Sequence, residues 1–251
     1  MTSGSTGRFP CVQSFILTAH SRLRTNSPME STSATMARAL RQVFASEPSL
    51  ELFTEPGEVR RAQSLDQLYN QIHTCTKCPL GFTRTKFVFG VGNPHAEILF
   101  IGEAPGRDED LKGEPFVGRA GQLLDKMLTA IDLDRTQIYI ANILKCRPPE
   151  NRDPLPEESD ACLPHLAEQI RLIAPPFVCA MGRIAAQILL DTKTPISKLR
   201  GHWYEFGNAK MMVTFHPAAL LRNPEYKKDS WEDLKELRRA LDKHHDRPSK
   251  F

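Results

Sequence analysis

The chain lacks several features that would place it in common protein classes. No apolar stretch among its 251 residues approaches the ~18 residues that a membrane-spanning helix needs. Neither nucleotide-phosphate fingerprint, G-x-x-x-x-G-K or G-x-G-x-x-G, occurs anywhere. A strong charge of one sign is also missing, since the net charge is only +3, which permits nucleic-acid binding without arguing for it. These absences argue against an integral membrane protein and against a P-loop or dinucleotide-binding enzyme.

Cysteines are few, but four of them are grouped. The six cysteines are Cys11, Cys75, Cys78, Cys146, Cys162 and Cys179. Cys75 and Cys78 form a C-x2-C pair, and fifteen residues separate Cys146 from Cys162. No convincing signal peptide precedes them, so the sequence favours thiolate ligands in a reducing cytosol over disulfides. Spacing alone leaves both zinc and a [4Fe–4S] cluster open, and we expect Cys11 and Cys179 to be isolated thiols.

Residues 1–57 differ in composition from the rest of the chain. They are rich in Ser and Thr and poor in acids before Glu30. We expect a disordered N-terminal extension, with a transit peptide or a later start at Met29 or Met36 as alternatives. A short helix is predicted over 33–46. The ordered domain, assigned to 58–251, is expected to begin its first helix near Ser64, a suitable N-cap.

Strand and helix patterns alternate along this domain. Apolar β-rich runs lie at 97–101, 138–141, 177–181 and 211–215, and helical patterns lie at 65–72, 119–131, 157–173, 182–190 and 229–243. Buried strands separated by helices indicate a parallel sheet covered on both faces. Binding sites in such sheets lie beyond the carboxyl ends of the strands.

Several chemically useful side chains follow these strand ends. The first run leads to Glu103 and Glu109, and then to Phe116 on a glycine-flanked loop. The second run ends at Asn142, and the fourth leads to His216. An aromatic, an amide, an imidazole and a carboxylate at one sheet edge could together hold a flat polar ring, such as a flipped nucleobase.

Two other classes fit the cysteines as well. An iron–sulfur electron-transfer or redox-sensing protein would use the same four thiolates, and so would a zinc-stapled nucleic-acid-binding module. A redox module does not need Asn142 together with His216, so these two residues favour an enzyme over that class. Colour separates the zinc module, because a [4Fe–4S] protein is brown and a zinc protein is not.

The motifs themselves are similar to those of a known family. "CTKC", "GEAPGRDEDLKGEPFVGRAGQLLDKML", "NILKCRPPENRDP", "SDAC" and "FHPAALLRNP" resemble the family 4, iron–sulfur uracil-DNA glycosylases, in order and spacing, from about residue 68 to 242. The resemblance implies a three-layer α/β/α sandwich with a central four-stranded parallel sheet. It also implies a [4Fe–4S] cluster on the four grouped cysteines: Cys75, Cys78, Cys146 and Cys162.

The resemblance also implies an activity. Such an enzyme flips uracil out of DNA and hydrolyses the N-glycosidic bond, leaving an abasic site that initiates base excision repair. Its implied uracil-binding residues are Gly102, Glu103, Ala104, Phe116, Asn142 and His216. His216 would bond uracil O2, and Glu103 is the first candidate to orient the attacking water, with Glu109 second. The implied DNA contacts are a wedge from Leu220 or Leu221 and a phosphate contact from Arg222.

Further expectations concern the surrounding residues. Weaker phosphate candidates are Lys145, Arg147, Arg119 and Arg183, whereas Asp108 and Asp110 are expected only to solvate their loop. The segment "CRPPENRDPLPEESDAC" contains no histidine, so the covalent DNA adduct of one related subgroup is not expected. We expect a cytoplasmic monomer whose partner is uracil-containing DNA, single- or double-stranded.

Overall fold

The computed structural model describes residues 61–251. The predictions for 1–57, including the helix over 33–46 and the isolated Cys11, lie outside these described residues. Within them, no helix combines the length and the apolar character needed to cross a membrane.

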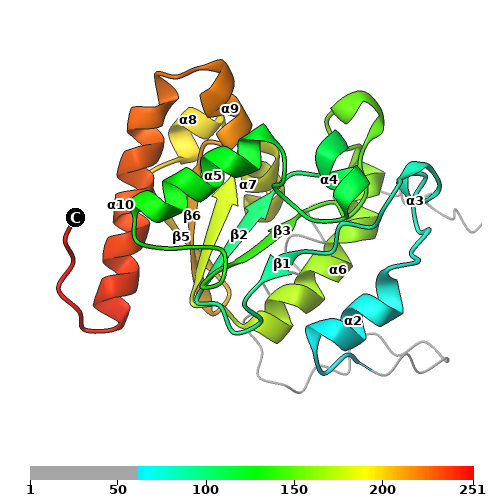
Figure 1. The fold of residues 1–251 in the computed structure, drawn as a ribbon, viewed down its shortest axis with the longest axis horizontal. Helices are drawn as coiled ribbons and strands as arrows, with labels where there is room; N and C mark the ends of the chain where they lie inside the picture. Colours follow the sequence, from blue (N-terminus) through cyan, green and yellow to red (C-terminus); the bar gives the residue numbers. More distant parts are fainter. Residues whose placement is uncertain (1–60) are drawn as a thin grey trace, which may run out of the picture. The chain divides into compact units, whose positions relative to one another are not determined.

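A six-stranded sheet forms the centre of the described domain (Figure 1). Its strands, in spatial order, are β1 (Val91–Gly92), β3 (Tyr139–Asn142), β2 (Ile98–Gly102), β4 (Phe177–Met181), β6 (Ala209–Thr214) and β5 (Trp203–Phe206). The inner four, β3, β2, β4 and β6, run parallel to one another. Their carboxyl ends therefore meet at one edge of the sheet, as the sequence predicted.

The prediction of a four-stranded sheet is too small by two strands. β1 pairs antiparallel with β3 at one edge, and β5 pairs antiparallel with β6 at the other. β5 and β6 are joined by a two-residue turn in which Gly207 has a φ of 61°, a conformation that tight hairpin turns require at this position. The sheet is therefore mixed, with a parallel centre and antiparallel edges.

Helices cover both faces of the sheet (Figure 1). They are α2 (Leu65–Ile72), α3 (Leu80–Thr83), α4 (Arg107–Lys112), α5 (Arg119–Ala130), α6 (Pro156–Ile173), α7 (Arg183–Leu190), α8 (Ile196–Leu199), α9 (Pro217–Arg222) and α10 (Tyr226–His244). Alternate β4 residues serve the two faces: Val178 and Ala180 pack in the core with α6 and α7, whereas Cys179 and Met181 pack in the core with α5 and α10. The arrangement is a three-layer α/β/α sandwich, and Cys179 is a buried core thiol, as expected.

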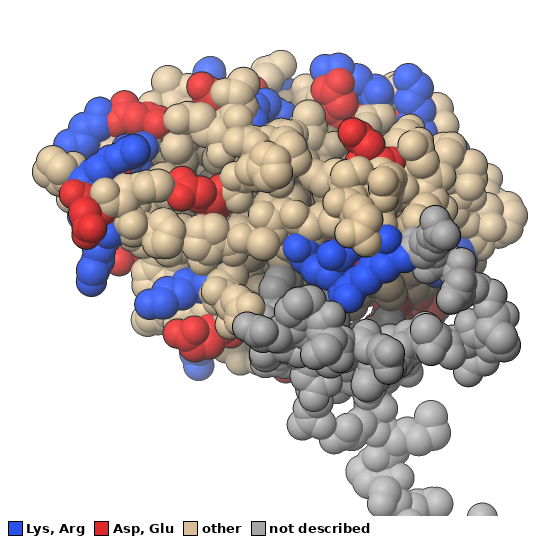
Figure 2. All heavy atoms as spheres, turned by 90° about the horizontal axis from the view of Figure 1, so that it is seen from below, with Lys and Arg blue, Asp and Glu red and all other residues tan. Residues whose placement is uncertain are grey.

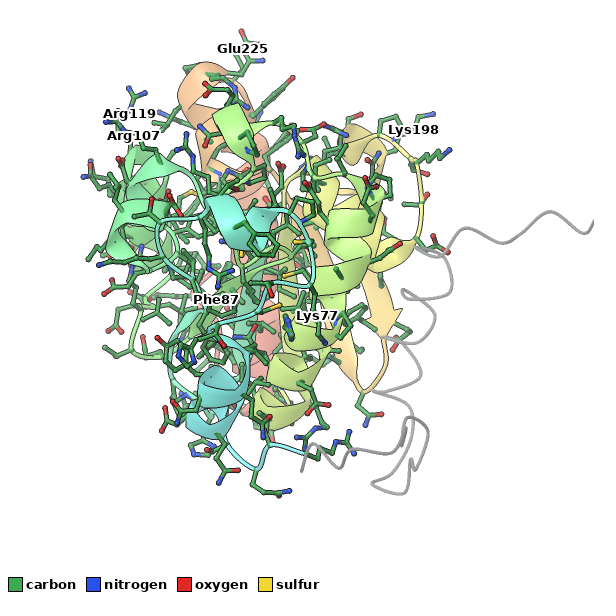
Figure 3. The ribbon with its side chains drawn as sticks, turned by 90° about the vertical axis from the view of Figure 1, so that its right-hand side faces the viewer. Lys77, Phe87, Arg107, Arg119, Lys198 and Glu225 are labelled. Atoms are coloured by element: carbon green, nitrogen blue, oxygen red, sulfur yellow. The ribbon has the colours of Figure 1, made fainter. Side chains whose placement is uncertain are left out.

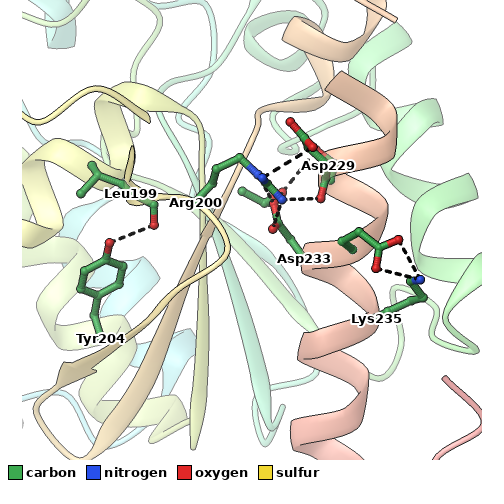
Figure 4. Close-up of polar contacts among 9 residues, drawn as sticks. Leu199, Arg200, Tyr204, Asp229, Asp233 and Lys235 are labelled. Carbon is green, nitrogen blue, oxygen red and sulfur yellow. Dashed lines mark hydrogen bonds and ion pairs between the residues drawn. The ribbon is translucent and has the colours of Figure 1, made fainter. Parts of the chain in front are cut away.

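Polar anchors hold the outer helices in place. Ser64 caps α2 by accepting a hydrogen bond from the backbone amide of Gln67, as the sequence predicted. At the other end of the chain, Arg200 forms an ion pair with the buried Asp233 of α10, and Thr214 of β6 donates to the same carboxylate (Figure 4). These contacts hold α10 against the face of β6.

Only the first part of the proline-rich segment between Cys146 and Cys162 is a loop. A single 3-10 turn covers Pro149–Asn151, and α6 begins at Pro156. Arg152 holds this junction, because its guanidinium donates to both oxygens of Glu158, whose side chain is 1% exposed. Cys162 therefore projects from a helix, which fixes its position more firmly than a loop would.

Charges of both signs occur on the surface. Figure 2 shows Lys and Arg side chains interspersed with Asp and Glu over the face seen from below, with one group of adjacent basic side chains near the middle of the view. This mixture agrees with the small net charge of +3.

Candidate active site

A cavity of about 580 Å³ opens at the carboxyl edge of the parallel strands. Its walls come from the segments that follow β2, β3, β4 and β6 and from the loop before α5. The predicted residues that line it are Glu103, Ala104, Glu109, Phe116, Asn142, Arg183, His216 and Arg222. The structure thus brings together side chains that stand more than 110 residues apart in the sequence.

Asn142 lies at the base of this cavity. It is the last residue of β3, pairs with Gly102 of β2, and is only 2% exposed. Its Oδ1 has no hydrogen-bond partner among the described residues. A buried polar atom without a partner is costly, so this oxygen fits a ligand that supplies an N–H group.

The absence of a side chain at Gly102 lets Asn142 and Phe116 approach its backbone closely. A Cβ at position 102 would lie 2.5 Å from Asn142 Oδ1 and 2.9 Å from the ring of Phe116. Any side chain at position 102 would therefore displace the amide or the aromatic ring. We call the part of the cavity lined by Asn142, Phe116 and His216 the slot.

Phe116 forms the aromatic wall of the slot. It is 4% exposed, and its ring centroid lies 5.2 Å from that of His216. Its φ of 56° places a non-glycine residue in the left-handed region, which costs roughly 1–3 kcal/mol and persists only where surrounding contacts enforce it. Strain of this kind is typical of ligand-binding positions.

His216 has a defined protonation state and tautomer. It is the N-cap of α9, where Nδ1 accepts a hydrogen bond of 3.1 Å from the backbone amide of Ala218. Burial, with a smaller contribution from the positive charge of Arg222, lowers the pKa of His216 to about 4. The ring is therefore neutral near pH 7, with its proton on Nε2, which remains as a hydrogen-bond donor.

Glu103 is the carboxylate with the strongest perturbation in the cavity. Burial, assisted by Asp153, raises the pKa of Glu103 from 4.5 to about 7, against opposing effects of Arg183 and Arg222. A carboxyl group that titrates near neutral pH in a cavity is suited to acid–base chemistry.

Glu109 lines the same cavity but is engaged differently. Its Oε1 accepts from the amides of Val117 and Gly118, and its Oε2 accepts from the amide of Gly106. The carboxylate thus holds the loop that carries the aromatic wall. The neighbouring Asp110 was expected only to solvate its loop, but it is 5% exposed and accepts from the amides of Thr85 and Lys86.

The other candidate DNA contacts differ in exposure, and of those described next only Arg183 lines the cavity. Leu221 is 45% exposed whereas Leu220 is 1% exposed, so only Leu221 is free to contact DNA without unfolding α9. Arg119 at the start of α5 and Arg107 at the start of α4 both point outward (Figure 3). Arg183 is half-exposed and paired with Asp153.

Two of the weaker phosphate candidates are internally bonded. The expectation for Lys145 is wrong, because this residue is 0% exposed and its Nζ donates to the backbone oxygen of Asn142 and to Gln169. Arg147 donates from Nε to Asn151 within the proline-rich segment.

The four predicted ligand cysteines lie close to one another. Cys75 and Cys78 each affect the pKa of Cys146, and Cys146 and Cys78 affect that of Cys162. Burial raises the pKa of Cys162 to about 12, so a thiolate there needs a bound positive group. Among residues 61–251, no group of three or more His, Cys, Asp or Glu has the geometry for one metal ion.

Hydrogen-bond donors surround these sulfur atoms. Arg84 donates to Cys146 Sγ at 3.3 Å and to the carbonyl of Cys75, and the amide of Lys145 donates to Cys162 Sγ at 3.3 Å. His165 Nε2 lies 3.3 Å from Cys75 Sγ. Such donors are typical of iron–sulfur sites, where they tune the cluster. Sequence reasoning missed Arg84 and His165, because neither belongs to a cysteine motif.

Comparison with known proteins agrees with this geometry. The family model of the uracil DNA glycosylase superfamily matches residues 89–235, which contain every residue of the cavity described above. The chain belongs to this superfamily.

Its relatives place it in one branch. A type-4 uracil-DNA glycosylase from Archaeoglobus fulgidus is 48% identical over 70% of this chain and 92% of its own length. Proteins of the same description from Sulfurisphaera tokodaii and Thermotoga maritima are 42% and 41% identical, over 70% and 73% of this chain and 84% and 97% of their own lengths. The chain is a member of the type-4 uracil-DNA glycosylases.

Proposed function

We propose that this protein excises uracil from DNA by hydrolysing the bond between N1 of the base and C1′ of the deoxyribose. The product is an abasic site, which initiates base excision repair. The observation that carries the proposal is the buried, unpartnered Oδ1 of Asn142 beneath the slot formed with Phe116. Membership of the type-4 family supports it.

Recognition of uracil depends on the slot. A uracil flipped out of the helix stacks on Phe116, and its N3–H donates to Asn142 Oδ1 while its O4 accepts from the amide nitrogen. Gly102 has no side chain to block the ring. Backbone groups of Glu103 and Ala104 complete the wall, as the family resemblance implies.

Bond cleavage depends on His216 and Glu103. The N1–C1′ bond breaks as electrons move into the base, so negative charge develops on uracil O2 and positive charge on the sugar. Nε2 of the neutral His216 donates to O2, and this hydrogen bond strengthens as the charge grows. The carboxylate of Glu103 orients the attacking water and offsets the positive sugar. Glu109 supports the loop and does not act on the water, because all its contacts are with backbone amides.

DNA contacts surround the cavity. Leu221 inserts into the base stack from which uracil has left, and Arg222 contacts a flanking phosphate. The partner is uracil-containing DNA, single- or double-stranded, and the protein acts as a monomer in the cytoplasm.

The cysteines fit a [4Fe–4S] cluster. Arg84 and the Lys145 amide, which donate to Cys146 Sγ and Cys162 Sγ, would offset the negative charge of a bound cluster. The cluster would be held by Cys75, Cys78, Cys146 and Cys162. It would act as a structural crosslink that joins α6 to the segment that follows α2.

A uracil-release assay tests the proposal. Purified protein is incubated with uracil-containing single- and double-stranded oligonucleotides, and abasic sites are then cleaved with alkali. Strand scission is expected on at least one substrate, and none on either would refute the activity. Asn142→Ala and His216→Ala should lose activity while keeping the brown colour of an iron–sulfur protein. Brown protein without scission on any substrate would instead favour an electron-transfer or redox role.

A further inference from the structure

The backbone that carries the stacking ring is held in an unfavourable conformation. Phe116 has a positive φ of 56°, and its carbonyl is packed against Gly121 of α5. A Cβ on Gly121 would lie 1.7 Å from Phe116 O. The carbonyl therefore lies directly on the helix surface, where only glycine leaves room.

An arginine outside every recognised motif holds this carbonyl. Arg135 lies in the segment between α5 and β3, and its Nη2 donates to Phe116 O. Its Nη1 donates to Pro115 O at 3.3 Å, and its Nε donates to Asp125 of α5 at 2.6 Å. One guanidinium thus joins two consecutive carbonyls of the loop to the helix behind it.

The same loop is held from its other side by Glu109. This carboxylate binds the amides of Val117 and Gly118, the two residues that follow Phe116. Carbonyls before the turn are bound by a cation and amides after it by an anion. Together these two side chains enforce the strained peptide between them.

We propose that Arg135 is a positioning residue for uracil excision, acting through Phe116. By binding the carbonyls of Pro115 and Phe116, it keeps the aromatic ring at the stacking distance from the flipped base and against His216. The inference rests on the proposed function, because it requires uracil to stack on Phe116. A lysine cannot replace this arginine fully, because its single ammonium lacks the planar fork that spans two carbonyls and a carboxylate.

Arg238 of α10 provides a matched control, because it binds the chain just after α5. Its guanidinium also donates to two consecutive carbonyls, those of Ile131 and Asp132, and pairs with a carboxylate, that of Asp242. This clamp lies at the C-terminal end of α5 and contacts no residue that lines the cavity. Removing it affects stability in the same manner without touching the stacking loop.

The experiment is a double-mutant cycle with Arg135→Met and Phe116→Ala, read as kcat/KM on a single-stranded uracil oligonucleotide. Alone, Arg135→Met is expected to lower kcat/KM by ~10²-fold, the scale of loss for a ring displaced by about 1 Å. Added to Phe116→Ala, it should cause no further loss, because the ring it positions is already absent. Arg238→Met should leave kcat/KM unchanged.

The outcomes separate this inference from the proposed function. An inactive wild-type protein refutes the proposed function itself. If the wild type is active and Arg135→Met has the same kcat/KM, only the positioning role is refuted. The positioning role is also refuted if the fold-loss of the double variant equals the product of the fold-losses of Arg135→Met and Phe116→Ala. If Arg135→Met fails to fold, Arg135→Lys replaces it in the cycle with a smaller single loss and the same requirement of no further loss.

Discussion

The raised pKa of Glu103 predicts how the rate of uracil release depends on pH. Moving this pKa from 4.5 to about 7 corresponds to ~3 kcal/mol of cost to the charged carboxylate. The proposed mechanism needs that charged form to orient water and offset the positive sugar. With a pKa of about 7, the ionised fraction is ~10% at pH 6 and ~90% at pH 8, so kcat/KM should rise about tenfold between them.

Neighbouring charges allow the assignment to be checked. Asp153 raises the pKa of Glu103 and Arg183 lowers it. Asp153→Asn should therefore move the midpoint of the profile to lower pH, and Arg183→Met should move it to higher pH. His216 does not produce this limb, because its pKa of about 4 leaves it neutral throughout this range.

The assay is alkali cleavage of a labelled uracil oligonucleotide under single-turnover conditions from pH 5 to 9. Glu103→Gln should reduce the rate and leave a flat profile. A wild-type profile without a midpoint in this range would refute the reasoning, as would a midpoint that persists unchanged in Glu103→Gln. Circular dichroism at each pH ensures that the folded protein is being compared.

Three further predictions concern the slot, the wedge and the fold. Gly102→Ala should lower uracil release by at least ~10²-fold in protein that circular dichroism shows to be folded, because its Cβ would lie 2.5 Å from Asn142 Oδ1 and displace that amide. Activity near wild type would show that base recognition does not depend on the position of this amide. Leu221→Ala should reduce activity on double-stranded DNA by roughly tenfold and leave activity on single strands largely unaffected, since only a duplex must be unstacked. Equal losses on both substrates would contradict the insertion of Leu221 into the base stack. Asp233→Asn should destabilise the protein by about 2 kcal/mol in urea unfolding, because Arg200 loses its buried carboxylate partner and keeps only Asp229. Glu232→Gln, in an exposed pair with Lys235, should cost less than ~0.5 kcal/mol, and similar costs for the two variants would argue against the anchoring role of Asp233.

The parallel centre of the fold could be predicted from the sequence, because buried strands read as continuous apolar runs. The edge strands could not be predicted in the same way. β1 has only two residues, Val91 and Gly92, which is too short for any pattern. β5 carries the aromatic sequence "WYEF" directly before a Gly-Asn turn, a hairpin signal that was present but not used.

The sequence predicted that several side chains would meet at one edge of the sheet, but not the state of each group. Sequence placed Asn142, Phe116 and His216 together, because strand ends converge. It could not distinguish Glu103 from Glu109, since the difference depends on which carboxylate meets backbone amides after folding. Arg135 was missed because its two bonds to loop carbonyls leave no trace in residue spacing.

His216 connects two steps of the proposed reaction, the release of the base and the binding of DNA by α9. Its Nδ1 holds the first turn of the helix that carries Leu221 and Arg222. Below about pH 4 the imidazole binds a second proton, and Nδ1 can then no longer accept from Ala218. The leaving group would then face a positively charged imidazole. At the same time α9 would lose the hydrogen bond from the Ala218 amide to His216 that caps its first turn. Acid would therefore impair base release and DNA binding together, because both depend on the neutral form of His216.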